Sequence, residues 1–195
     1  YEDADVYAFV KNNGGKVAVY KENLYKPMPG YRFIASNTDR SRYYVGELNG
    51  KSSKQAYMDA LHISESNIIN QTFHNPIGKM NGQDICIISL KEVSGNGLCC
   101  YRQVNDSDVL VLLEEQDYNE ILDETLQRIR RDFNHISGVF SINCVFRYLL
   151  FSQEHHMEDY LKTMSTLGDH AGLIGFGEHY NQQFVNQTMT CVVFE

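Results

Sequence analysis

Hydrophobic residues recur at helical spacing most clearly between Tyr118 and Asn134, where they form a stripe along one face. Asp117 stands immediately before this stretch, in the position of an N-cap. A second helix is expected after Ser52, which can cap it with Gln55 three residues further on. A third is expected over about 154–167. The chain therefore contains at least three amphipathic helices.

Short apolar runs bounded by turn-forming residues predict strands along the rest of the chain. The runs 84–90, 98–102 and 109–113 follow one another with short polar links, which favours an antiparallel meander. Another strand should end at the turn pair Asn49-Gly50. The full set of further strands expected is 6–10, 16–21, 42–48, 138–146, 172–178 and 188–194.

Strands that are grouped ahead of helices and joined by hairpin-length links indicate an α+β fold, with an antiparallel or mixed β-sheet and flanking helices. Residues 1–42 carry too few apolar side chains for a core of their own. They should pack either on the rest of the chain or on a segment that is missing from it.

Composition narrows the class of partner. The chain has 195 residues, and 25 acidic against 17 basic side chains give a net charge of −8, which argues against nucleic acid and anionic membranes as partners. No apolar run approaches the length of a membrane span. Its 5 cysteines are odd in number and scattered, which favours buried free thiols in a reducing compartment over a disulfide framework.

Several signatures of chemistry are missing from the sequence. There is no phosphate-binding glycine loop ending in Lys-Ser/Thr, no cysteine pairing at zinc spacing and no Gly-x-Ser-x-Gly elbow. The adjacent His155 and His156 would start a helix and diverge by about 100°, so they cannot face one metal ion. We therefore expect neither a metal nor a cofactor.

Cys144 and Arg147 form the first group with possible chemistry. In a strand over 138–146, Cys144 shares an apolar face with Ile142 and Phe146, which indicates a buried packing thiol. The alternative is a nucleophilic thiol. Arg147, at the end of that strand, can hold a structural ion pair or a ligand carboxylate through its planar fork of donors.

Glu178 forms the second group with Gly177. If the strand continues through 172–178, Glu178 lies on the same face as Ile174 and Phe176 and brings a carboxylate to the rim of that face. A solvated strand end is the alternative.

The third group is Asn186-Gln187-Thr188, which opens the last strand. Their polar side chains can fix a loop or bind a polar ligand.

The order of these motifs resembles the C-terminal half of FIST domains. Cys144-x-x-Arg147, a helix, Gly177-Glu178, a polar loop and Asn186-x-Thr188 follow one another as in that family. Upstream, the segments 45–51 and 75–78 look like the family's junction before a helix and its proline-glycine segment. The resemblance covers about residues 43–195, and it implies that residues 1–42 are trailing strands of a truncated N-terminal FIST half.

The resemblance implies a cytoplasmic sensory domain of a signal-transduction protein that is not an enzyme. Such a domain would bind an amino acid or related metabolite and act beside an output domain such as a histidine kinase or chemotaxis receptor. By resemblance, position for position, the ligand-binding residues are Cys144, Arg147, Gly177, Glu178, Asn186 and Thr188.

For an amino-acid-like ligand, Arg147 would take the carboxylate and Glu178 the ammonium. Two alternatives stay open. One is a cysteine-dependent enzyme in which Cys144 is activated by His135, His170 or His179. The other is a protein-interaction domain without a ligand.

Overall fold

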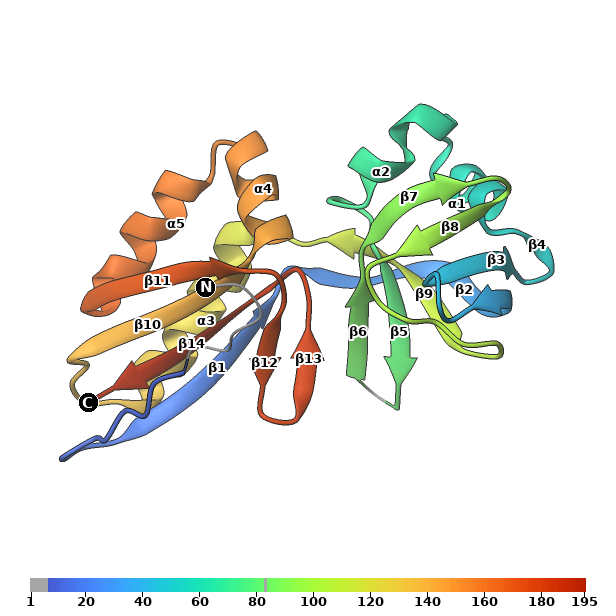
Figure 1. Ribbon diagram of the computed structural model, residues 1–195. Coiled ribbons are helices and arrows are strands. Elements are labelled where there is room, and N and C mark those ends of the chain that lie inside the picture. The colour runs from blue at the N-terminus through green and yellow to red at the C-terminus, as the bar shows by residue number, and fades with distance from the viewer. Residues whose placement is uncertain (1–6, 83) are drawn as a thin grey trace.

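The computed structural model describes residues 7–82 and 84–195, and most of its strands form two sheets that stand side by side (Figure 1). The four-stranded sheet has the order β1-β14-β10-β11. Within it β10 and β11 are parallel, and the other pairs are antiparallel. Its strands are β1 (Val17–Asn23), β10 (Gly138–Cys144), β11 (Asp169–Gly175) and β14 (Thr188–Phe194).

The curled sheet has the order β6-β5-β9-β2-β3-β8-β7, with β4 paired to β3. Its two end strands, β6 and β7, are separated in the chain by Ser89 alone, so the sheet curls until its edges meet. It encloses an apolar core that includes Val45, Leu98 and Leu110. Its strands are β2 (Tyr25–Asp39), β3 (Tyr44–Leu48), β4 (Lys51–Ser52), β5 (Ile77–Asn81), β6 (Asp84–Ile88), β7 (Leu90–Ser94), β8 (Gly97–Cys100) and β9 (Val109–Glu115).

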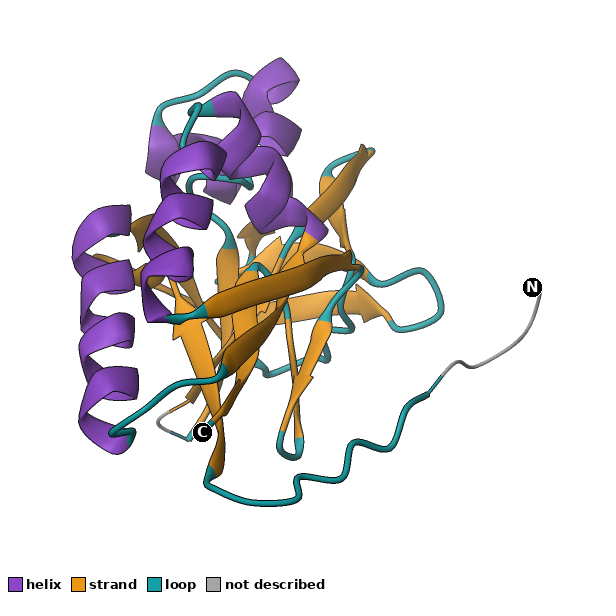
Figure 2. Ribbon diagram, turned by 90° about the vertical axis from the view of Figure 1, so that its left-hand side faces the viewer, coloured by secondary structure: helices purple, strands orange, loops and turns teal. Residues whose placement is uncertain are grey.

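The helices cover one side of the sheets (Figure 2). The longest helix, α3, packs against β1, and α4 with α5 makes the crossover between the parallel strands β10 and β11. No helix of the described residues is both long and apolar enough to cross a membrane. The helices are α1 (Ser53–Leu61), α2 (Ile68–Gln71), α3 (Tyr118–Asp132), α4 (Val145–Gln153) and α5 (Met157–Met164), with 3₁₀ turns at Glu65–Asn67 and Ser165–Leu167.

The predicted fold class is confirmed: the chain is α+β, with antiparallel and mixed sheets and flanking helices. The two predicted caps are also present. The hydroxyl of Ser52 accepts a bond from the backbone N–H of Gln55 at 3.3 Å, and Asp117 accepts from Asn119 and Glu120 at 2.9 and 3.0 Å. Local capping chemistry therefore sets the starts of α1 and α3.

The predicted meander is wrong as a whole, although its first link is confirmed, because β7 and β8 pair antiparallel across the turn at 94–97. The run 84–90 contains all of β6 and the first residue of β7, and these two strands lie at opposite ends of the sheet order. The strand over 109–115 pairs with β2 and β5 rather than with β8. The long strand β2 enters between β9 and β3, and a sequence read from neighbour to neighbour does not reveal such an insertion.

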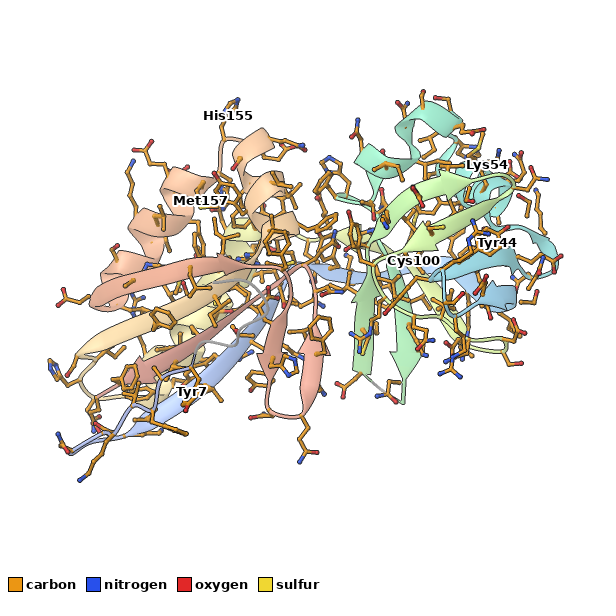
Figure 3. All side chains as sticks on the ribbon, viewed as in Figure 1. Tyr7, Tyr44, Lys54, Cys100, His155 and Met157 are labelled. Atoms are coloured by element: carbon orange, nitrogen blue, oxygen red, sulfur yellow. The ribbon has the colours of Figure 1, made fainter. Side chains whose placement is uncertain are left out.

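The predicted strand 138–146 and helix 154–167 are also wrong in their bounds. The strand ends at Cys144, and α4 begins at Val145. A turn separates α4 from α5. His155 lies in this turn with φ 55°, and its side chain points away from the body of the molecule (Figure 3). The apolar run after Cys144 has aromatic and aliphatic residues on all sides of a helix and therefore lacks a helical period. For this reason the sequence pattern did not predict α4.

The predicted strand 172–178 stops at Gly175. Gly177 follows with φ +115°, and Glu178 opens a separate hairpin of β12 (Glu178–Tyr180) and β13 (Gln183–Val185). Glu178 therefore does not continue the face of Ile174, and Phe176 is 92% exposed. The expected strand 6–10 is not formed over Tyr7–Val10, and its first residue lies outside the described part of the chain.

The described part of residues 1–42 is built into both sheets. Strand β1 pairs along its whole length with β14, and β2 pairs with β3 and β9. Only the buried Leu24 separates these two strands. The segment thus packs on the rest of the chain, and its membership of a longer N-terminal half stays a prediction.

The face of the four-stranded sheet that is turned away from the helices, here called the outer face, is rich in apolar side chains. Val17, Val19, Phe140 and Leu173 lie on it and are 40–48% exposed. The β12–β13 hairpin covers part of it, with Tyr180 near Val19 and Phe140 around one hollow. Exposed apolar patches of this kind favour association.

We expect the isolated chain to associate as its concentration rises, and the variant Phe140→Thr to shift the equilibrium toward monomer. Light scattering over a concentration series measures this. Leu161→Thr, which removes an apolar side chain of similar exposure from α5, is the matched control. A chain that stays monomeric at all concentrations would contradict association through the outer face.

Candidate functional site

The first turn of α4 gathers most of the residues predicted from the sequence. Cys144 is the N-cap of α4, and Arg147 lies in its first turn. Glu178 accepts a 2.8 Å hydrogen bond from the hydroxyl of Thr188, which opens β14. All four side chains are almost completely buried. The structure therefore brings Cys144, Glu178 and Thr188 together, with Arg147 one turn of helix away.

Arg147 is held by a residue that sequence reasoning missed. Its guanidinium forms an ion pair with Glu22 of β1, and both side chains are at most 1% exposed. The guanidinium also lies over the rings of Phe151 and Tyr160, at 4.6 and 5.5 Å from their centroids. Of the two roles open for Arg147, the structure shows the ion pair.

The pattern of β1 contained a signal for Glu22. Alternate residues of this strand face the helices, and Tyr20 and Glu22 share that buried face. A carboxylate on a buried strand face requires a cation, and Arg147 supplies it. The Nε and Nη1 atoms of Arg147 and one oxygen of Glu22 have no hydrogen-bond partner among the described residues.

Glu178 is the most perturbed acid in this region. Burial raises the pKa of its carboxyl from 4.5 to about 7, while Thr188, the thiol of Cys144 and the charge of Arg147 act in the opposite direction. Its second oxygen, Oε1, has no partner that meets hydrogen-bond geometry. Near neutral pH the group thus lies at the midpoint of its titration.

Gly177 makes this placement possible. A Cβ atom at this position would lie 2.5 Å from the ring of Phe184 and 3.0 Å from the Oδ1 of Asn186. Its φ of +115° is also one that other residues rarely adopt. Glycine here lets the chain turn sharply after β11, so that Glu178 can start the hairpin opposite Val185.

The environment of Cys144 disfavours a thiolate. Burial raises the pKa of the thiol, the negative charge of Glu178 raises it further, and nearby backbone N–H groups of Gln187 and Phe146 offset this only in part. Within the described residues, no histidine donates to or accepts from this thiol. His170 bonds to the hydroxyl of Ser141 at 2.9 Å.

Gln187 is the middle residue of the predicted polar group Asn186-Gln187-Thr188, for which loop fixing was one of the two expected roles. Its side chain is fully buried, and its Nε2 donates to the carbonyl oxygen of Thr72 at 3.0 Å. This bond ties the start of β14 to the segment after α2. Thr72 in turn accepts a 2.9 Å hydrogen bond from the backbone N–H of Leu90 in β7, so the start of β14 is connected to the curled sheet through Thr72.

A cavity of about 400 Å³ lies in front of these buried groups, between the curled sheet and α4. Of the predicted site residues, Cys144 and Asn186 line it, whereas Arg147, Gly177, Glu178 and Thr188 are not among its lining residues. Its other lining residues are Ile69, Phe73, Ser89, Leu90, Lys91, Tyr101, Val145, Phe146, Leu149, Phe176 and Phe184. The cavity is mainly apolar and strongly aromatic.

The topology explains the position of the cavity. The parallel strands β10 and β11 end at Cys144 and Gly175, so their carboxyl ends meet at one edge of the sheet. Open sheets with parallel strands commonly bind ligands outside this edge, where a helix begins. Here α4 begins there and the curled sheet closes the other side. The described residues contain no cluster of His, Cys, Asp and Glu suited to a metal ion.

Comparison with protein families identifies the domain. The model of the FIST C domain matches residues 54–181. The chain belongs to the FIST C family. This confirms the resemblance seen in the motif order, and it makes the chain a member of a family of sensory-type domains. Comparisons with curated proteins and with solved structures give no significant match.

The FIST C match contains Cys144, Arg147, Gly177 and Glu178, whereas Asn186 and Thr188 lie beyond its end. Glu22 also lies outside it. The buried ion pair therefore joins a residue of the matched region to a strand that precedes it. The FIST C region of this chain depends on β1 for the neutralisation of its buried arginine.

The Glu178 carboxyl should make the stability of the domain fall as pH rises. Its folded-state pKa of about 7 lies above its ordinary value of 4.5, so its stabilising contribution is complete below about pH 4.5 and is lost as pH rises through 7. The difference is about 3 kcal/mol in the free energy of unfolding.

Urea unfolding of Glu178→Gln and the parent chain between pH 4.5 and 8.5 tests this. The variant should gain about 3 kcal/mol relative to the parent over this range. Glu158→Gln, on the solvent-exposed side of α5, is the control. A constant difference at all pH values would contradict the raised pKa.

Replacing one partner of the Glu22–Arg147 pair should lower the free energy of unfolding more than replacing both partners. We expect Arg147→Met to lower the free energy of unfolding by about 3–5 kcal/mol, because it leaves the Glu22 carboxylate buried without a cation. The double variant Glu22→Gln with Arg147→Met should recover most of this loss. Urea unfolding measures both, with Arg130→Met on exposed α3 as the control. Additive losses in the double variant would contradict the pairing.

Proposed function

We propose that this FIST C domain senses a small molecule, which binds in the cavity between the curled sheet and α4. The observation that carries the proposal is the cavity itself. Its volume of about 400 Å³ falls within the range of small-molecule sites, which are mainly apolar with a few polar groups. Cys144 and Asn186 connect it to the family motifs.

The ligand that we propose is an amino acid or a related metabolite, sensed in the cytoplasm on behalf of a signalling output domain such as a histidine kinase or chemotaxis receptor. The charge pair expected from the sequence acts indirectly in this proposal. Arg147 is occupied by Glu22 and anchors the first turn of α4, so it positions Val145 and Phe146 on the cavity wall. Glu178 supports the same turn through Cys144.

The cavity also suggests how binding becomes a signal. Its wall combines residues of the curled sheet, such as Leu90, with residues of α4 and of the hairpin, such as Leu149 and Phe184. A ligand that contacts both parts favours one relative arrangement of them over others. The two remaining interpretations have weaker support: the high pKa of Cys144 argues against a thiol nucleophile, and a protein-interaction domain does not require the cavity.

A thermal-shift screen of amino acids and metabolites tests the proposal. A ligand at 100 times its dissociation constant adds about 2.7 kcal/mol to the free energy of unfolding, which raises the melting temperature of a chain of this size by about 5–10 °C. The variant Val145→Phe should abolish the shift, because it fills the cavity from the first turn of α4.

Leu161→Phe, an enlargement on α5 away from the cavity, is the control and should keep the shift. A ligand whose shift is unaffected by Val145→Phe binds elsewhere. If Val145→Phe leaves every ligand-induced shift in the melting temperature unchanged, the cavity is not the sensing site.

A further inference from the structure

Aromatic side chains dominate the wall of the cavity, which is lined by Phe73, Tyr101, Phe146, Phe176 and Phe184. Three of these rings remain uncovered: Tyr101 is 52% exposed, Phe176 is 92% exposed and Phe184 is 37% exposed. Apolar surface that is left exposed around a hollow is typical of a binding groove. Aromatic rings gain free energy from offset-stacked or edge-to-face contact with other rings. The wall therefore favours a planar aromatic ligand.

The aromatic wall consists of two groups. The rings of Phe73 and Tyr101 each lie with their centroids 5.3 Å from that of Phe146, so this group is assembled without a ligand. Phe176, which precedes the hairpin, and Phe184 of β13 form the second group, and both line the same cavity. A flat ligand in the cavity can contact both groups and cover the rings that the fold leaves exposed.

The wall offers no free charge that could hold a charged ligand. Lys91 is the one charged residue among its lining residues, and it is exposed to solvent. Arg147 is 1% exposed and is paired with Glu22, and Glu178 is 2% exposed. A zwitterion that enters the cavity would lose the hydration of two charged groups without gaining an ion pair in return. The cavity therefore favours a neutral ligand.

Asn186 supplies the free polar group of the wall. The residue lines the cavity and is 7% exposed. The side chains of its neighbours Gln187 and Thr188 are engaged in hydrogen bonds, whereas the amide of Asn186 forms none with any described residue. Unlike the hydroxyl of Ser89, this amide is not fully enclosed. It is therefore accessible to a ligand in the cavity.

The chemistry of an amide indicates which ligand edge fits it. A side-chain amide presents an acceptor oxygen beside a donor nitrogen. A ligand with an N–H group next to a C=O group, as in a lactam, satisfies both atoms at once. A ligand without these groups leaves the amide of Asn186 buried and unpaired, which costs free energy.

From these observations we infer that the ligand is a neutral, planar aromatic compound that carries an N–H donor beside a C=O acceptor, and that Asn186 binds this edge. The ring of the ligand lies against the aromatic wall, where it covers Phe176 and Phe184. This inference rests on the proposed function, and it narrows the related metabolite named there to an uncharged aromatic compound.

Three compounds with similar bicyclic rings test the inference: oxindole, 1-methyloxindole and tryptophan. Oxindole is a neutral lactam, 1-methyloxindole lacks its N–H group, and tryptophan is a zwitterion. Isothermal titration of the full chain should show that oxindole binds at least about fivefold more tightly than 1-methyloxindole, because one neutral hydrogen bond is lost. Tryptophan should also bind more weakly than oxindole, because its two charges have no partner in the cavity.

Variants separate the hydrogen bond from the aromatic contacts. Asn186→Leu should weaken oxindole about fivefold and bring its affinity to that of 1-methyloxindole. Tyr101→Leu should weaken both oxindoles about threefold, because it removes a ring from the wall. Tyr7→Leu, which changes an exposed ring that does not line the cavity, is the matched control and should alter neither affinity.

The outcomes distinguish the two proposals. The inference is overturned if oxindole does not bind, if 1-methyloxindole or tryptophan binds as tightly as oxindole, or if Asn186→Leu leaves the preference for oxindole unchanged. In each of these cases the cavity stays the sensing site as long as Val145→Phe blocks another ligand of the metabolite screen. If Val145→Phe blocks no ligand, oxindole included, both proposals fall.

Discussion

The buried ion pair between Glu22 and Arg147 is the interaction on which the arrangement around the cavity depends. It joins the end of β1 to the first turn of α4, in a part of the core where neither charge meets water. Immediately after Glu22, the chain leaves the four-stranded sheet at Leu24 and enters the curled sheet as β2. One contact thus fixes both the direction of α4 and the point at which the chain passes between the sheets.

The cavity is a product of two irregularities in otherwise regular elements. Strand β7 shifts register against β8 at Lys91, next to the cavity-lining Leu90, and the positive φ of Gly177 turns the chain from the end of β11 into the hairpin. Regular strands at both places would have presented alternating side chains and left the motif residues apart. The buried Glu178 and Thr188 then support the wall from behind, while Asn186 reaches it.

The sequence predicted elements well where their signals are local. The caps at Ser52 and Asp117 and the fold class follow from composition and spacing, whereas the insertion of β2 between β9 and β3 depends on pairing across the whole chain. The candidate site was predictable in its members but not in its geometry. Cys144 belongs to the motif whether a strand or a helix contains it. Arg147 could be assigned to a ligand because its actual partner, Glu22, lies 125 positions away in the sequence.

The pairing of β1 with β14 also governs how the chain can fold. Strand β1 is bonded along its length to β14, so the four-stranded sheet cannot close until residues 188–194 are available. The curled sheet, whose strands end at Glu115, has no such requirement. During synthesis the curled sheet can form first. Until β14 is made, β1 has an unpaired edge, and the carboxylate of Glu22 is exposed to water. Such long-range closure is slow, and it makes the late arrival of β14 the step that protects the nascent chain from aggregation.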